Sequence, residues 1–141
     1  MVPADDGGSP APIDRPVLEL LRERLLGTTQ VSAARITDED GHLELRTVLS
    51  DAYYPTAVER AVLSVRWYTN DDFKIHYREV RGDDWQCRWD SHPNPHNSRD
   101  HFHPPPNAET PGEDASWPDD YREVLALVLE EIEGRIDDIW H

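Results

Sequence analysis

Apolar residues recur at two different spacings along this chain, and these spacings predict two helices separated by strands. Residues 14–27 carry leucine and valine at helical spacing, with Asp14 as a suitable N-cap and Gly27 as the end of the repeat. A second, longer amphipathic helix is predicted from residue 116 onward. Its apolar positions are Tyr121, Val124, Leu125, Val128, Ile132, Ile136 and Ile139.

Between the helices, apolar and polar residues alternate with period two, which is the spacing of half-buried strands. The five predicted strands cover residues 29–37, 42–50, 58–68, 73–80 and 84–90. Asp40-Gly41 and Arg81-Gly82-Asp83 are turn signals, so the strands beside them should pair as antiparallel hairpins. The expected fold class is α+β: an antiparallel sheet of about five strands flanked by an N-terminal and a long C-terminal helix.

Two proline-rich segments fall outside this pattern. Residues 1–13 are acidic with almost nothing to bury, and we expect a disordered acidic tail there. Residues 91–118 carry seven of the 12 prolines and four of the seven histidines, and we expect a His/Pro-rich loop. A chain of 141 residues has the length of one domain, which we expect over residues 14–141.

The chain is strongly acidic, with 29 Asp and Glu against 14 Lys and Arg, and a formal net charge of -15. Lys74 is the single lysine. This composition is typical of a halophilic, haloarchaeal-type protein, because molar salt screens repulsion among carboxylates. An acidic protein that binds a basic partner is the alternative. We expect a cytoplasmic protein without a membrane span, and the single cysteine, Cys87, excludes a disulfide framework within one chain.

The alternation also predicts a basic sheet face. If the apolar positions of all five strands face the core, the polar positions between them share the opposite face. That face would gather half of the 14 basic residues: Arg35, Arg46, Arg60, Arg66, Lys74, Arg78 and Arg88. Two interpretations stay open: a surface for phosphate or a protein partner, or a solvated face that nearby Asp and Glu neutralise.

The loop after the last predicted strand concentrates groups that transfer protons or bind metals. Its histidines and carboxylates are Asp90, His92, His96, Asp100, His101 and His103. Imidazole moves protons near neutral pH, and Arg88 beside it can hold a phosphate by bidentate donation, so phosphodiester chemistry is one interpretation of the pattern. The same groups are metal ligands, but the intervening prolines lead us to expect no tightly bound ion. A structural loop, with its histidines bonded to backbone carbonyls, is the third interpretation.

Residues 73–103 resemble the central motif of the TumE-like family, small prokaryotic toxins of toxin–antitoxin pairs. The matching positions are His76 and Tyr77, then Arg88, Asp90 and Ser91, then His92, His96, His101 and His103. The resemblance covers roughly residues 17–136. It implies a toxin component whose partner is a cognate antitoxin.

The expected function is therefore that of a toxin-like protein acting on RNA through an Arg/His/Asp cluster on the basic face. The expected catalytic residues are Arg88, Asp90, His92, His96, His101 and His103. The expected rim or substrate-binding residues are His76, Tyr77, Lys74, Arg78 and Arg66. Arg88, Asp90, His92 and one of His101 and His103 should form a solvent-reachable cluster near His76.

No cofactor and no metal are expected. The expected partners are a cognate antitoxin, for which a helix-turn-helix protein is one option, and RNA; a homodimer is left open and a membrane is not expected. Whether the protein is a ribonuclease-type enzyme also stays open. The alternatives are a non-catalytic partner-binding module and a small His-loop metalloprotein.

Overall fold

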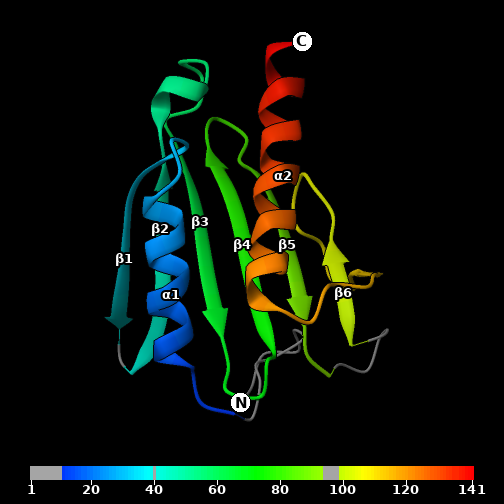
Figure 1. Cartoon of the computed structure of the whole chain (residues 1–141). Coiled ribbons are helices and arrows are strands. Elements are labelled where there is room, and N and C mark those ends of the chain that lie inside the picture. Colours follow the sequence, from blue (N-terminus) through cyan, green and yellow to red (C-terminus); the bar gives the residue numbers. More distant parts are fainter. Residues whose placement is uncertain (1–10, 40, 94–98) are drawn as a thin grey trace.

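Two helices cover one face of a single antiparallel sheet (Figure 1). The computed structural model describes residues 11–39, 41–93 and 99–141. The helices are α1 (Arg15–Leu26) and α2 (Tyr121–Trp140), with a short 3-10 helix, η1, at Asp51–Tyr53. The strands are β1 (Val31–Glu39), β2 (His42–Leu49), β3 (Arg60–Trp67), β4 (Phe73–Val80), β5 (Trp85–Ser91), β6 (Asp100–His103) and β7 (Glu113–Asp114). Each strand pairs with the next in chain order, so the sheet is a meander.

The sheet has seven strands and not about five, because β6 and β7 form within the segment predicted as a loop. Strands β1 to β5 follow the five predicted ranges. β6 pairs with β5 from Ser91↔Asp100 to Arg88↔His103, although it contains two histidines and one aspartate in four residues. Such a short polar segment has little intrinsic strand propensity. Its conformation comes from the ladder of hydrogen bonds that β5 offers.

Local sequence explains both ends of α1. The carboxylate of Asp14 accepts a hydrogen bond from the amide of Val17, which is the predicted N-cap interaction. Gly27 ends the helix, where its amide donates to the carbonyls of Glu23 and Arg24. The apolar stripe of α1 packs on β1, β2 and β3 and is fully buried at Leu18, Leu21 and Leu25.

Helix α2 starts five residues later than predicted, at Tyr121, with Asp120 as its N-cap. The residues before it are held to the sheet instead. The Trp117 amide donates to Asp100, and the Trp117 indole donates to the carbonyl of Asp90. This anchor ties the segment before α2 across the end of β5 and β6. The helix itself buries Val124, Leu125, Val128 and Ile132.

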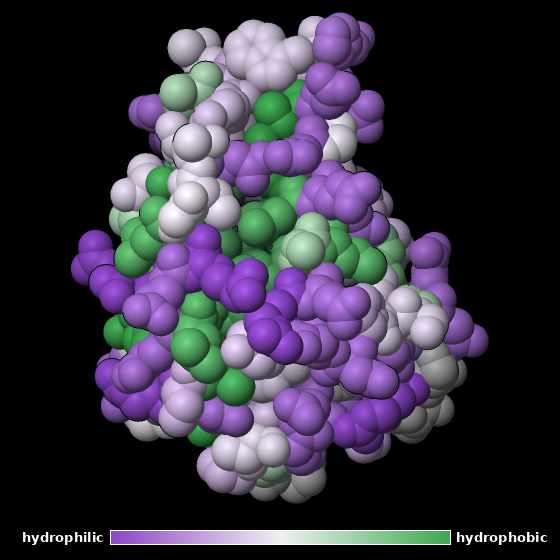
Figure 2. All heavy atoms as spheres, viewed as in Figure 1, coloured by the Kyte–Doolittle hydropathy of each residue, from purple (hydrophilic) through white to green (hydrophobic). Residues whose placement is uncertain are grey.

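The core lies between the helices and the sheet, and apolar side chains show between the two helices in Figure 2. The predicted burial of Trp67, Trp89, Leu63, Val65 and Ile75 is confirmed, while Trp85 is half-buried. Trp67 stacks on Phe73 with ring centroids 4.7 Å apart, a contact that adds to the area both rings bury. The alternation therefore identified the core face correctly.

A charged network is buried in this core. Glu79 is fully buried and receives two hydrogen bonds from Arg135 of α2, at 2.9 and 2.8 Å. The hydroxyl of Tyr77 donates to Glu79 at 2.8 Å, and Tyr54 lies 2.7 Å from the same hydroxyl. Burial raises the pKa of Tyr54 to about 12. Tyr77 therefore belongs to the core, which corrects its expected place on the rim of the site.

The beginning of the described chain is fixed to the sheet. Residues 1–10 of the predicted acidic tail lie outside the described residues. Ile13 forms a β-bridge with Tyr68, and the Asp14 amide donates to the carbonyl of Trp67 at 2.7 Å. No helix in the described part of the chain is both long enough and apolar enough to cross a membrane.

Candidate functional site

The sheet face opposite α1 and α2, called the open face below, carries the basic residues. Among the described residues, no helix lies on it. The strand register places all seven predicted residues there, which confirms the basic face expected from the alternation. One row of the register crosses the face through Arg35, Arg46, Ser64, His76, Arg88 and His103.

Acidic neighbours neutralise only part of the open face. Ion pairs join Arg66 to Glu44 at 3.2 Å and Arg78 to Asp84 at 2.6 Å. Arg88 pairs with Asp90 at 2.8 Å. Arg35 and Arg46, by contrast, are exposed and form no ion pair within the described ranges. No ion pair in the described ranges supports the neutralised-face interpretation at the β1–β2 end of the sheet.

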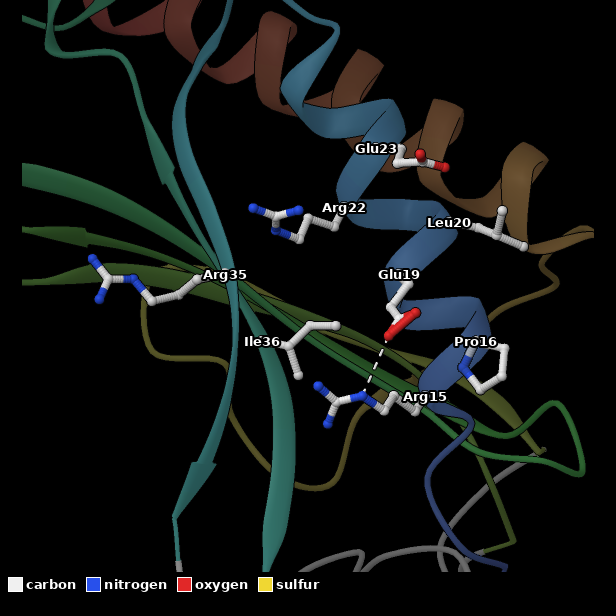
Figure 3. A pocket seen from close by; sticks show the side chains of 8 residues that line it. All are labelled: Arg15, Pro16, Glu19, Leu20, Arg22, Glu23, Arg35 and Ile36. Carbon is white, nitrogen blue, oxygen red and sulfur yellow. Dashed lines mark hydrogen bonds and ion pairs between the residues drawn. The ribbon is translucent and has the colours of Figure 1, made fainter.

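Arg35 and Arg46 are direct cross-strand partners, so two like charges face each other on neighbouring strands. Directly opposed like charges destabilise a sheet. An Asp or Glu at either position would form an attractive pair instead, and the chain uses these two residue types 29 times. Figure 3 shows Arg35 on the side of β1 away from α1, while Arg22 reaches toward the strand and donates to the carbonyl of Ala34 at 2.8 Å. Stability does not account for the Arg35–Arg46 pair.

His76 lies in the same row, between Ser64 and Arg88, and its ring is half-buried. Its Nε2 lies 2.8 Å from Oε1 of Gln86. Burial lowers the pKa of His76, and the charges of Arg88 and Arg78 lower it further, while the Gln86 contact acts in the opposite direction. The ring is therefore neutral at neutral pH. With Nε2–H donating to Gln86, the lone pair stands on Nδ1, which makes His76 a proton acceptor beside two guanidinium groups.

The titration of His76 tests this description. We expect NMR to give a pKa below the ordinary 6.5, and Arg78→Ala to move it upward because one of the charges opposing protonation is lost. Arg78 is exposed, so the fold should tolerate the change. A pKa at or above 6.5, or one that does not respond to Arg78→Ala, would contradict the electrostatics assigned to the open face.

A second group of residues lies beside Arg88 and shares His103 with the row. It is called the histidine cluster and consists of Asp90, His92, His101 and His103. Oδ2 of Asp90 lies 3.4 Å from Nε2 of His92, 3.6 Å from that of His101 and 3.3 Å from that of His103. Each of the four side chains is at most 1% exposed. The structure thus brings these residues together, but the expected solvent access is wrong for all four. Arg88, 22% exposed at the side chain, connects the cluster to the surface.

The cluster is buried because β6 and the segment that follows it cover the end of β5. The cross-strand pair Asp90↔His101 lies within the sheet, and Trp117 closes over the backbone of Asp90. Burial by itself raises the pKa of Asp90. The contacts with His101, His103 and His92 and the charge of Arg88 outweigh burial and hold that pKa well below its usual range. A buried ionised carboxylate is therefore the centre of the cluster.

The remaining predicted residues divide between the two faces. Lys74, Arg66, Arg78 and His76 lie on the open face as expected, and Tyr77 lies on the opposite one. His96 lies outside the described residues. Burial raises the pKa of the Cys87 thiol to about 12, so this residue is no nucleophile.

The sequence reasoning placed Arg35 and Arg46 on the basic face but did not single them out. The register that makes them partners begins at Glu39↔His42, the residues that flank the predicted Asp40-Gly41 turn signal in the sequence. A two-residue hairpin turn fixes the pairing of every residue on both strands. The Asp40-Gly41 signal was therefore sufficient to find the pair.

Comparison with known proteins gives one match. The sequence model of a family described as Toxin TumE matches residues 17–136, from α1 through most of α2. No curated protein and no solved structure matches the chain. The matched span includes the open face and the histidine cluster.

Proposed function

Because the chain belongs to the TumE toxin family, we propose that it is the toxin of a toxin–antitoxin pair and that it binds RNA along the open face of its sheet. The family also supports a cognate antitoxin as its partner. The overall negative charge of the chain repels a polyanion such as RNA. The basic residues of the open face supply the local attraction that binding requires. A locally positive face on a chain of net charge -15 confines RNA binding to that face.

The Arg35–Arg46 pair is the observation that carries this proposal. Both guanidinium groups are exposed, lie on the same face and face each other across neighbouring strands. Strands in a sheet are about 4.8 Å apart, so the two groups can contact one phosphate together. The repulsion between them is relieved when the phosphate binds. That relief favours an anion at this point over any neutral ligand.

The rest of the row supports a reaction on the bound strand. His76 is neutral and accepts protons at Nδ1, and Arg88 is its cross-strand neighbour. In this proposal, His76 removes the proton of a ribose 2′-hydroxyl that attacks the adjacent phosphate. The bond from phosphorus to the 5′-oxygen of the next nucleotide breaks, a 2′,3′-cyclic phosphate forms, and water protonates the leaving 5′-oxygen. Arg88 stabilises the charge that develops on the phosphate. His92, His101 and His103 take no part in proton transfer, because their rings are buried.

A growth assay with Arg35→Glu tests the proposal in cells. This change replaces the repulsive cross-strand pair with an attractive Glu–Arg pair. We therefore expect the free energy of unfolding, measured in urea, to rise by about 0.2–1 kcal/mol. Expression of the unmodified chain without its antitoxin should arrest growth, and the Arg35→Glu variant should not. Loss of toxicity then accompanies a gain in stability and cannot result from misfolding.

Arg24→Glu is the matched control, since Arg24 is exposed on α1, on the helical side of the sheet. It should remain toxic. Full toxicity of the Arg35→Glu variant would remove the open face from the proposal. An unmodified chain that does not slow growth would argue against a toxin and favour the non-catalytic binding module.

A further inference from the structure

The orientation of three rings in the histidine cluster is fixed by backbone carbonyls. Nδ1 of His92 lies 3.1 Å from the carbonyl oxygen of Pro93, and Nδ1 of His101 lies 3.1 Å from that of Arg99. Nδ1 of His103 lies 2.8 Å from the carbonyl oxygen of Glu109. A carbonyl oxygen only accepts hydrogen bonds, so the proton is on Nδ1 in each ring. In a neutral imidazole, the lone pair is then on Nε2.

All three Nε2 atoms face the same carboxylate oxygen. Oδ2 of Asp90 is the common neighbour of the three rings. Carboxylate oxygens and imidazole nitrogens are the ligand atoms that divalent transition-metal ions take in proteins.

The guanidinium of Arg88 contacts two of these atoms. Its Nε donates to Oδ2 of Asp90 at 2.8 Å, and its NH2 group lies 3.1 Å from Nε2 of His103. The carboxylate oxygen and the ring nitrogen therefore converge on a position that already holds a positive group, and a metal ion is a positive species that both atoms can bind.

The distances agree with a shared metal ion. A tetrahedral ion with bonds of about 2.0–2.1 Å separates its ligand atoms by about 3.3–3.4 Å. The three Nε2 atoms lie 3.4, 3.6 and 3.3 Å from Oδ2 of Asp90. Hydrogen bonds between ionised partners are shorter, about 2.7–2.9 Å. The ligand atoms of Asp90, His101 and His103 all lie within 4.8 Å of one another.

We propose that Asp90, His101 and His103 bind one divalent transition-metal ion of the zinc class. The surrounding contacts are those that metal ligands usually have, because each of the two rings donates its other nitrogen to a backbone carbonyl. Arg88 donates to both carboxylate oxygens of Asp90 and lies beside Nε2 of His103. The ion would take the place of this guanidinium beside Oδ2 of Asp90 and Nε2 of His103.

The ligands come from β5 and β6, so the ion would fasten β6 to the end of β5. Prolines argued against a metal in the sequence, and Pro93 and Pro95 do lie between Asp90 and His101. The β5–β6 ladder nevertheless holds these two ligands in register. This inference is independent of the proposed RNA function, since an ion can fasten β6 in a chain of any activity.

Metal analysis of the unmodified full chain, purified without a histidine tag, tests the site directly. We expect about one zinc per chain by elemental analysis. After removal of zinc by a chelator, added Co²⁺ should give the visible absorption of a tetrahedral site, and added Zn²⁺ should raise the melting temperature. Sub-stoichiometric metal in the purified chain, with no binding of added Zn²⁺ or Co²⁺, would overturn the proposal.

Two variants locate the ion. His101→Gln should weaken Zn²⁺ binding by more than about 100-fold, because it removes a ligand, whereas loss of a supporting contact alone costs about 10–100-fold. His42→Gln is the control, since His42 is exposed on β2, and it should bind zinc like the unmodified chain. Undiminished binding by a folded His101→Gln variant would place the ion elsewhere and overturn the assignment. If that variant does not fold, the cobalt spectrum of the unmodified chain decides.

Discussion

Arg135→Ala should lower the free energy of unfolding by about 3–5 kcal/mol, the usual cost of removing one partner from a buried ion pair. Arg135 donates two hydrogen bonds to Glu79, whose side chain is fully buried beneath α2. Its guanidinium also lies 3.9 Å from the ring centre of Trp85. Without Arg135, the carboxylate of Glu79 keeps Tyr77 and a distant contact with Arg81 at 3.6 Å. Neither replaces a bidentate guanidinium.

Urea unfolding of three variants separates this cost from general disruption. Arg122→Ala removes an exposed guanidinium from its pair with Asp120 and should cost far less than Arg135→Ala, because water screens an exposed pair. Adding Glu79→Gln to Arg135→Ala should restore part of the lost stability, because the unpaired charge is then gone. A loss below 1 kcal/mol for Arg135→Ala, or a further loss on adding Glu79→Gln, would contradict the buried pair as described.

The sequence predicts the fold well where the relevant information is local. Alternation within β2 to β5 and the helical stripe of α1 identify the core face without any knowledge of strand pairing. The same alternation places the basic residues on the open face, and it also contradicts the rim position given to Tyr77. His76 and Tyr77 are neighbours on one strand, so they point to opposite faces. The alternation was a better guide to Tyr77 than the family motif.

The histidine cluster could not be predicted in the same way, because it depends on the pairing of β6 with β5, which no local sequence pattern indicates. β6 is a strand only because β5 offers it a ladder. The covering segment is held by Trp117, whose partners Asp90 and Asp100 are 27 and 17 residues away in sequence. Without β6, the loop histidines look like exposed proton-transfer groups. With β6, they become a buried cluster whose lone pairs converge on one carboxylate.

RNA binding by the Arg35→Glu/Arg46→Glu double variant is the second large effect that we expect. Each exposed arginine attracts a phosphate by about 1 kcal/mol in water, and reversal adds a repulsion that salt partly screens. A total loss of about 1.4 kcal/mol per change weakens binding about tenfold. The double variant should therefore bind single-stranded RNA about 100-fold more weakly. The loss should not reflect misfolding, because both residues are exposed and lack ion pairs within the described ranges.

The most direct test of the open face as an RNA-binding surface is how the affinity for RNA depends on salt concentration. Fluorescence anisotropy with a labelled single-stranded RNA measures that affinity at each salt concentration. Each phosphate contact contributes about 0.7 to the slope of log affinity against log salt, so loss of two contacts should make the slope shallower by about 1.4. Arg24→Glu, on the helical side, should leave both slope and affinity unchanged. If the unmodified chain does not bind RNA, or if the double variant binds with unchanged affinity and slope, the open face is not the RNA-binding surface.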